Sequence, residues 1–366
     1  MKIPDELQQL LDRMIQKNAS DLILTEGQPP IFRELGDLCP LQASKLTGED
    51  VQRIADGMLS EEQKKCFERE RELDASFGLE GVARFRLNVF LQKGKIGMAI
   101  RMLPYQIPTL ESLGAPEIVK HWLSIPHGIV ITTGPTGAGK STTQAAMIGY
   151  LNQKKPYHLI TIEDPIEYVH SHGTCTIQQR EVGQDTLSFA EALKHVFRQS
   201  PDVIMIGEMR DPETFQTALE LAETGHLVLA TLHTGDASQA ISRIIDVFPA
   251  DQQQQVRVQL SLTLVGVLVQ QLVPGVDGIR HLAVEVLDVN AAVRNLIRKD
   301  ELPQLYSVIQ TGSEEGMRTM NQSLIALFQQ GKISLEQAAL FTTRQKELEQ
   351  LLARMPRPRT SSLRVA

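Results

Sequence analysis

The chain has 366 residues, enough for two or three domains with buried cores. Its 37 lysines and arginines stand against 44 aspartates and glutamates, and the net charge of −7 argues against nonspecific binding to nucleic acid. Cys39, Cys66 and Cys175 lie far apart and form no C-x-x-C pair. A disulfide framework or zinc knuckle is therefore not expected, and a reducing cytoplasm fits.

The N-terminal part mixes helical and strand-like patterns. Apolar residues recur with helical or alternating spacing, and one stretch, 61–74, is so dense in both charges that it is expected to be a solvent-facing helix. Helices are expected at 5–17, 48–58 and 61–74, and strands at 20–25, 83–90 and 97–102. This mixture predicts a compact α/β domain over 1–104, followed by a linker rich in proline at 105–117.

A glycine-rich loop follows the β-branched apolar run 128–133 and precedes a stretch without proline, 141–151. It fits G-x-x-x-x-G-K-[ST], in which glycines let backbone N–H groups curl around phosphate oxygens at the positive start of a helix. Lys140 can reach the β- and γ-phosphates, and the Ser141 hydroxyl can hold Mg²⁺. The candidate binding residues are Gly134, Pro135, Thr136, Gly137, Ala138, Gly139, Lys140, Ser141 and Thr142. The sequence thus predicts binding of a nucleoside triphosphate.

Further apolar runs predict buried parallel strands that end at Thr133, Ile162, Ile206 and Thr231. Polar residues follow each of these ends. Open parallel sheets place their sites beyond the carboxyl ends of the strands. We therefore expect an α/β nucleotide-binding domain over 118–290, with its chemistry at these ends.

Two of these strand ends carry acids. Glu208 follows the strand that ends at Ile206, and its carboxylate can polarise an attacking water or help hold Mg²⁺; an acid that caps the next turn is the structural alternative. Glu163, Asp164 and Glu167 follow the strand that ends at Ile162. Three carboxylates so close together repel one another unless a cation, an arginine or hydrogen bonds compensate. This favours a role near Mg²⁺ or the water, without assigning a role to each acid.

Two histidines flank the strand 227–232. His226 precedes it and His233 follows it, so the two cannot ligate one metal together. His233, at the carboxyl end, is the better sensor of the γ-phosphate or of the water. His226 alone is typical of a structural hydrogen-bonding group.

The longest uncharged run, 258–276, contains three glutamines and Pro274. It is expected to form a core helix and not a membrane span, so any membrane role requires a partner. After about residue 290 amphipathic patterns predict a helical region over 291–353. The tail 354–366 has four arginines and no acid, and is expected to be disordered.

Together these motifs resemble the retraction ATPases of type IV pili (PilT-like), within the wider secretion ATPase family (GspE/PilT). The resemblance extends over about residues 5–340 and rests on 134–143, 161–168, 179–183, 198–202, 207–211, 222–226 and 231–234. It implies an N-terminal PAS-like α+β domain, a RecA-like P-loop ATPase core and C-terminal helices, assembled as a homo-hexameric ring. It also implies ATP and Mg²⁺.

The resemblance implies roles for individual residues. Lys140 binds the phosphates, Glu208 is the catalytic acid and, with Ser141, serves Mg²⁺, whereas Glu163 and Asp164 form an acidic box beside Glu167. His226 and His233 match a histidine box, which raises His226 above its interpretation from the residues alone. Arg86 and Arg101 match arginines of the N-terminal domain that reach the γ-phosphate, a contribution worth ~10³–10⁵ in kcat.

The segment 292–299 resembles a retraction-type motif, from which it departs at Val293 and Lys299. From the residues alone it is an amphipathic helix with Arg294 and Arg298 at i and i+4. We expect these two guanidiniums to share one exposed face and, together with Asn295, to serve a contact with acidic groups of a partner.

The resemblance implies an ATP-hydrolysing motor for pilus retraction and twitching motility, cytoplasmic and peripheral at the inner membrane through a platform protein. Alternatives are an accessory retraction ATPase and an ATPase of pilus extension or type II secretion assembly. The four-cysteine zinc insert common in the assembly enzymes is absent. A motor on DNA is the weakest alternative, because the pI is about 5.8.

Overall fold

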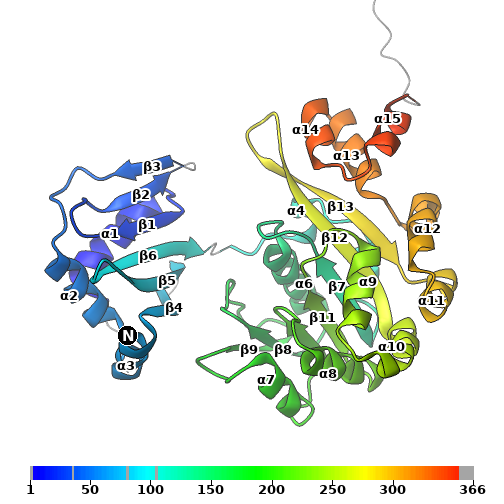
Figure 1. The fold of residues 1–366 in the computed structure, drawn as a ribbon, viewed down its shortest axis with the longest axis horizontal. Helices are drawn as coiled ribbons and strands as arrows, with labels where there is room; N and C mark the ends of the chain where they lie inside the picture. Colours follow the sequence, from blue (N-terminus) through cyan, green and yellow to red (C-terminus); the bar gives the residue numbers. More distant parts are fainter. Residues whose placement is uncertain (1–2, 35–36, 80–81, 104–105, 354–366) are drawn as a thin grey trace, which may run out of the picture. The chain divides into compact units, whose positions relative to one another are not determined.

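The structure, a computed structural model, describes residues 3–34, 37–79, 82–103 and 106–353 and forms two compact units (Figure 1). The first unit comprises Met1–Ile107 together with Asp164–Val169, and the second comprises Pro108–Glu163 and His170–Ala366. The change of unit at 107–108 falls within the expected linker, whereas the contribution of 164–169 to the first unit was not expected. The expected tail 354–366 lies outside the described residues, and the boundaries expected within the second unit stay predictions.

The first unit contains a six-stranded sheet in the order β3-β2-β1-β6-β5-β4, with every neighbouring pair antiparallel. The expected strands at 20–25, 83–90 and 97–102 are confirmed as β1, β5 and β6, and three more complete the sheet. The strands are β1 (Asp21–Leu24), β2 (Ile31–Glu34), β3 (Asp37–Pro40), β4 (Glu72–Leu79), β5 (Ala83–Gln92) and β6 (Lys95–Leu103).

Helices α1 (Asp5–Gln16) and α2 (Gly48–Met58) contribute buried side chains to one core with Phe32 and Phe85 of the sheet. Both helices were expected from their apolar spacing. The helix expected over 61–74 is wrong at its end: α3 (Glu61–Glu70) stops at Arg71, whose φ is 66°, and β4 begins at Glu72. Charged residues continue past the end of the helix at Arg71, Glu72 and Asp74, so the charge pattern does not mark the change from helix to strand.

The second unit contains a seven-stranded sheet in the order β13-β12-β7-β11-β10-β8-β9. The four strands expected from apolar runs are β7, β8, β10 and β11, and they pair in parallel as predicted. The α/β fold class is therefore confirmed. The strands are β7 (Gly128–Thr133), β8 (His158–Glu163), β9 (Thr176–Glu181), β10 (Val203–Ile206), β11 (Leu227–Thr231), β12 (Leu264–Pro274) and β13 (Arg280–Asp288).

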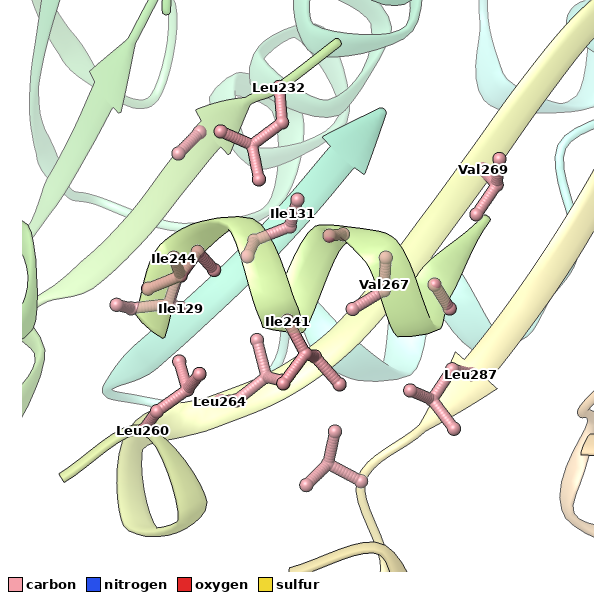
Figure 2. Close-up of a cluster of buried hydrophobic side chains, with 14 of the residues drawn as sticks. Ile129, Ile131, Leu232, Ile241, Ile244, Leu260, Leu264, Val267, Val269 and Leu287 are labelled. Atoms are coloured by element: carbon pink, nitrogen blue, oxygen red, sulfur yellow. The ribbon is translucent and has the colours of Figure 1, made fainter. Parts of the chain in front are cut away.

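Helices cover both faces of this sheet. Alternate strand residues enter two apolar clusters, one with the helices before β8 and the other with the helices after β9. Figure 2 shows Ile241 and Ile244 of α9 over Ile129 of β7 and Val267 of β12. These helices are α4 (Leu110–Leu113), α5 (Ile118–Trp122), α6 (Lys140–Lys154), α7 (Phe189–Val196), α8 (Pro212–Glu223), α9 (Ala237–Asp246) and α10 (Ala250–Thr263).

The core helix expected over 258–276 is wrong. Helix α10 ends at Thr263, and the following eleven residues form β12, which lies between β7 and β13. Because β12 is buried on both faces, it lacks the polar alternation that marks a half-exposed strand, and an apolar run of this kind cannot be told from a buried helix. Strands β12 and β13 form the long hairpin drawn in yellow in Figure 1.

The C-terminal part is helical, as expected, and packs within the second unit. Its elements are α11 (Ala291–Arg298), α12 (Leu305–Thr311), α13 (Met320–Gln329), α14 (Leu335–Phe341) and α15 (Gln345–Ala353), with short 3₁₀ turns at Leu302–Gln304 and Ser313–Glu315. Throughout the described ranges, no helix combines the length and apolar character needed to cross a membrane.

The expectation that Arg294 stands fully exposed is wrong, because its side chain is half-buried; its contact with a partner stays a prediction. Its Nη1 donates to the carbonyl oxygens of Ser261 (2.6 Å) and Leu262 (2.8 Å), at the end of α10. These carbonyls belong to the last turn of a helix and have no partner within it, so a guanidinium is a favourable cap. Asn295 and Arg298 remain exposed on α11.

Candidate functional site

The phosphate loop connects β7 to α6 and approaches β12 closely. A Cβ atom on Gly134 would lie 2.3 Å from the carbonyl oxygen of Gln270, so no side chain fits there. Helix α6 begins at Lys140 with Gly139 as its N-cap, a residue that has no side chain to cap the helix. The first N–H groups of an α-helix have no partner within the helix and carry a partial positive charge. This helix start is therefore suited to an anion.

Lys140 is 8% exposed and turned back onto its own loop. Its Nζ donates to the carbonyl oxygens of Gly134 (2.8 Å) and Pro135 (3.0 Å) and lies 3.3 Å from Nδ1 of His233. An ammonium group has donors only, so Nδ1 of His233 acts as the acceptor. A neutral His233 ring in this arrangement carries its proton on Nε2.

Glu208 lies on the other side of the same imidazole. Its Oε2 is 3.5 Å from Nε2 of His233, and its Oε1 is 2.8 Å from Nε of Arg210. His233 thus bridges the lysine of the phosphate loop and the strand-end acid. The sequence predicted all three residues, but Arg210 was missed because an arginine after a strand end is an ordinary surface residue.

The residue before this acid is constrained by β8. A Cβ atom on Gly207 would lie 3.1 Å from the carbonyl oxygen of Ile162 and 3.3 Å from Cα of Glu163. These are tighter than most real Cβ contacts, so a larger residue would push the two strand ends apart. Position 207 therefore favours glycine. The first acidic side chain after β10 stands at the next position, Glu208.

The loop that carries His233 is anchored to the strand before the phosphate loop. The N–H of Thr234 donates to Oγ1 of Thr133 (2.8 Å), and the N–H of Leu232 donates to the carbonyl of Thr132 (3.1 Å). Both threonines are fully buried at the end of β7. The position of His233 and that of the phosphate loop are therefore coupled through β7.

The three acids expected after β8 do not share one unit. Glu163 is 8% exposed in the second unit, and its Oε1 accepts hydrogen bonds from Oγ1 of Thr161 (2.6 Å) and Nε2 of Gln179 (3.0 Å). Asp164 and Glu167 belong to the segment 164–169 of the first unit. In that segment the carbonyl of Ile166 accepts from Nε of Arg84 (3.2 Å).

The structure does not bring His226 to these strand ends within one chain. Its Nδ1 lies 2.9 Å from the carbonyl oxygen of Leu221 and 3.2 Å from Oγ1 of Thr224, before the first residue of β11. His233 lies beyond the last residue of that strand. At about 3.3 Å per residue, the two histidines are roughly 20 Å apart along the chain.

Arg86 and Arg101 lie on the sheet of the first unit, directly opposite each other in β5 and β6. Nε of Arg101 is 2.8 Å from Oδ1 of Asp21, and Nη2 of Arg86 is 3.5 Å from Oδ1 of Asp74. Like charges at directly opposite positions destabilise a sheet. Repulsion between the two arginines therefore destabilises the sheet, and the two aspartates partly offset this repulsion.

A cavity of about 790 Å³ lies beside the start of α6. Gly139 and Thr142 line one side of it. The rest of the lining is mixed: it includes Glu111 and apolar residues, and four basic side chains from β13 and from the C-terminal helical part, Arg280, His281, Arg318 and Lys332. Sequence reasoning missed this cavity, because its basic residues are scattered over the chain and form no motif.

Another missed residue is Gln270 of β12, whose side chain is fully buried. Its Nε2 donates to Oγ1 of Thr143 (2.9 Å), in the first turn of α6. A glutamine within an otherwise apolar run was the signal that would have found it. Gln270 and its backbone contact with Gly134 hold the phosphate loop against β12.

The residues present fit a Mg²⁺ ion that is held mainly by substrate phosphates. In the part of the chain that the structure describes, no three histidine, cysteine or acidic side chains gather as a metal site. Mg²⁺ in nucleotide sites takes one or two protein oxygens and completes its shell with phosphates and water. Ser141, exposed in the first turn of α6, supplies such an oxygen.

Comparison with known proteins places this arrangement in a family. The family model of the type II/IV secretion system proteins matches residues 90–340. The type IV pilus retraction ATPase PilT of Pseudomonas aeruginosa is 45% identical over 333 residues, which cover 91% of this chain and 97% of that protein. The chain belongs to the type II/IV secretion system protein family.

Two further members of the family extend this result. The type IV pilus ATPase PilU of Pseudomonas aeruginosa is also 45% identical, over 91% of this chain and 87% of that protein. The crystal structure of the pilus retraction motor PilT with bound ADP matches with a TM-score of 0.89 and 48% identity, over 96% of this chain and 99% of that one. The resemblance to PilT-like ATPases is thus confirmed over nearly the whole chain, while the PAS-like character of the first unit stays a prediction.

Proposed function

We propose that this family member hydrolyses ATP to ADP and phosphate and uses the energy to retract type IV pili. The observation that carries the proposal is the bridge through His233, which contacts Lys140 of the phosphate loop at 3.3 Å and Glu208 at 3.5 Å. A glycine-rich turn without a catalytic role needs neither a buried lysine nor an acid in contact with the same imidazole. The relatives named above supply the second half of the proposal, pilus retraction.

Binding of the phosphates begins with the open start of α6. Its first N–H groups and the ammonium of Lys140 meet the negative charge, and Lys140 exchanges its bonds to the carbonyls of Gly134 and Pro135 for phosphate oxygens. The cavity beside Gly139 takes the nucleoside part, since 790 Å³ lies within the usual range of small-molecule sites.

Hydrolysis itself falls to Glu208. The contacts with Arg210 and His233 orient its carboxylate, which accepts the proton of the attacking water. Glu163, held by Thr161 and Gln179, positions the neighbouring strand end. Ser141 and Glu208 would hold Mg²⁺, which when bound neutralises charge on the phosphate oxygens.

Residues of the first unit complete the reaction in this proposal. Arg86 and Arg101 stabilise the charge that develops on the γ-phosphate, and Asp164 and Glu167 belong to the same unit. The two arginines lie opposite each other, which does not stabilise the sheet, and this supports a role in function instead of in folding. A homo-hexameric ring is part of the proposal, and any catalytic role of His226 rests on the resemblance alone.

The mechanical output requires a contact with the pilus machine. We assign it to the exposed face of α11, with Asn295 and Arg298, which would bind acidic groups of an inner-membrane platform protein from the cytoplasm. Replacing Arg298 with alanine should then leave ATP turnover intact and abolish twitching motility. Turnover that falls together with motility would assign this face to the catalytic ring instead.

The identity to PilU, equal to that to PilT, supports a second candidate, an accessory retraction ATPase. A motor for pilus extension or type II secretion is the third. Deletion of the gene, with surface pili counted, separates these functions. Loss of the retraction motor should leave abundant but immobile pili, loss of an extension motor should leave none, and loss of an accessory ATPase should leave retraction present but weakened.

A further inference from the structure

Glu285 is a buried acid that the proposed chemistry does not use. It lies on β13, opposite Val269 of β12, and is 4% exposed. Its Oε1 accepts a hydrogen bond from the N–H of Ala237 (2.9 Å), and the N–H of Met320 is near enough to lower the pKa of the carboxyl group. Ala237 is the first residue of α9 and Met320 is the first residue of α13. One side chain therefore faces the leading N–H groups of two helices.

The caps of the two helices leave these N–H groups to Glu285. In α9 the Asp236 side chain accepts from the N–H of Gln239 (2.8 Å), and in α13 the Thr319 side chain accepts from the N–H of Gln322 (3.2 Å). A buried N–H without an acceptor is costly. The carboxylate, with two oxygens, offers an acceptor to each of these donors.

One of these helices begins at the catalytic loop. Ala237 follows His233 by four positions, and Thr234 between them is bonded to Thr133 of β7. The body of α9 is held by apolar packing of Ile241 and Ile244 on the sheet (Figure 2). Apolar packing is non-directional, so the hydrogen bond from Ala237 adds a directional restraint where the loop enters the helix.

The other helix belongs to the C-terminal part. Strand β13 holds α13 on both sides of Glu285: the N–H of Val284 donates to Oγ of Ser323 (3.0 Å), and Val286 exchanges backbone hydrogen bonds with Arg318. Helix α13 in turn packs against α14 and α15. A shift of these helices on β13 therefore acts directly on the carboxylate.

We propose that Glu285 is a positioning residue for ATP hydrolysis: its carboxylate joins the starts of α9 and α13 and thereby sets the His233 loop against the C-terminal helices. The inference rests on the proposed ATPase function. Glu285 does not touch the nucleotide in this account. It acts through Ala237 on the loop, and through Met320 it makes that loop responsive to the C-terminal helices.

We call the link that Glu285 forms between the starts of α9 and α13 the joint. The charge of the Glu285 carboxyl group gives a way to test it. Burial raises its pKa to about 7, against the opposing effect of the two N–H donors; Asp236 at the start of α9 raises the pKa further and Arg344 lowers it. A protonated carboxyl carries an O–H donor, which neither helix start can accept. Protonation below about pH 7 therefore costs the joint an acceptor.

The first test is the pH dependence of turnover by the full chain. In the parent, kcat should fall as the pH drops through about 7. Glu285→Gln should lower kcat about tenfold at higher pH, keep KM within about twofold and remove this acidic limb, whereas Glu285→Asp should keep the limb. A parent profile without the limb, or a Glu285→Gln variant that keeps the limb or the parent kcat, would overturn the proposal.

Ser238→Ala is the matched control. Ser238 lies in the same first turn of α9, and its Oγ donates to the carbonyl of Leu302 (2.8 Å), a second contact between α9 and the C-terminal part. Removing it loosens α9 without touching the carboxylate. We expect kcat within about twofold of the parent and an unchanged acidic limb. A loss of the limb in this control would show that loosening α9 suffices, and would contradict a specific role of Glu285.

A second variant removes the N–H of Ala237, which donates to the Glu285 carboxylate. Proline is favoured at the first position of a helix, Asp236 has the extended conformation that a following proline requires (φ −148°, ψ 168°), and α8 already begins Asp211-Pro212. Ala237→Pro therefore deletes the donor and fits the backbone at the start of α9, although position 237 is fully buried. It should lower kcat about as much as Glu285→Gln, and the double variant should be no slower than either. Independent, multiplying losses would overturn the joint.

Amide hydrogen exchange tests the joint without ATP. Glu285→Gln should accelerate exchange at the starts of both α9 and α13, and unchanged exchange at both would contradict the proposal. If the parent has no ATP turnover at all, the proposed function fails, and this measurement still decides whether Glu285 joins the two helices. If Ala237→Pro does not fold, the pH profile and the exchange data of Glu285→Gln decide alone.

Discussion

The two units hold their charged side chains in opposite ways. In the first, Arg101 is 66% exposed on a sheet and contacts Asp21, whereas in the second Lys140 is 8% exposed and contacts backbone carbonyls and a histidine. Exposed ion pairs stabilise a protein by about 0–1 kcal/mol. Buried charges need several compensating bonds to exist at all. The arginines of the first unit can therefore leave their aspartates and bind another group with little loss of stability. The charged side chains of the second unit are held in one arrangement by their bonds.

The largest expected effect concerns the exposed arginines of the first unit. Arg101→Ala and Arg86→Ala should each lower kcat about 10³-fold, with nucleotide affinity nearly unchanged, because their charge acts in the transition state. The free energy of unfolding should change by less than about 1 kcal/mol. Phosphate release, nucleotide titration and urea unfolding measure the three quantities.

Arg33→Ala is the control for this prediction. Arg33 lies in β2, opposite Asp21, and contacts the same carboxylate at 3.5 Å. It shares the face of the sheet but matches no predicted site residue. Its replacement should leave turnover near the parent value. Turnover within a few-fold of the parent for Arg86→Ala and Arg101→Ala would reduce all three arginines to surface residues.

The next effect concerns a buried acid of the second unit, Glu285, and the dependence of stability on pH. The pKa of Glu285 is raised from 4.5 to about 7 in the folded chain, so folding is favoured by proton binding between these values. The stabilising contribution is full below pH 4.5 and is lost as the pH rises through about 7. Between about pH 5 and pH 8 the parent should lose up to about 3 kcal/mol of stability relative to Glu285→Gln. Urea unfolding of both proteins at the two pH values measures the difference, and equal pH dependence would contradict the assignment.

A smaller effect separates two arginines of one helix. Arg294→Ala leaves the carbonyls at the end of α10 without their donor and should destabilise the chain by about 1–3 kcal/mol. Arg298→Ala, on the exposed face of the same helix, should change stability by less than about 0.5 kcal/mol. Thermal or urea unfolding compares the two variants. Equal stabilities would mean that the bonds of Arg294 contribute nothing to the fold.

The sequence predicted the elements whose pattern is local. The phosphate loop, the four parallel strands and the helices α1 and α2 follow from residue spacing, because each pattern is set by the element's own geometry. Lys140 was found from the glycine-rich motif, and Glu208 and His233 were found from their places just beyond strand ends. The resemblance added Arg86 and Arg101, which spacing alone cannot separate from ordinary sheet residues.

The missed features depend on contacts between distant parts of the chain. Strand β12 was taken for a helix because burial on both faces removed the alternation that marks strands. Arg294 was taken for a surface residue, and its partners lie 33 and 32 positions away. The joint at Glu285 needs three elements that are adjacent only in the folded chain. None of these contacts leaves a period or a motif in the sequence.

The central claim is that the constellation around His233 hydrolyses ATP, and Glu208→Gln tests it most directly. The amide keeps the shape of the carboxylate but cannot accept a proton from water. We expect ATP to bind with nearly the parent affinity, while steady-state phosphate release falls by about 10²-fold or more. Phosphate release near the parent rate would contradict the assignment of Glu208 and with it the proposed mechanism.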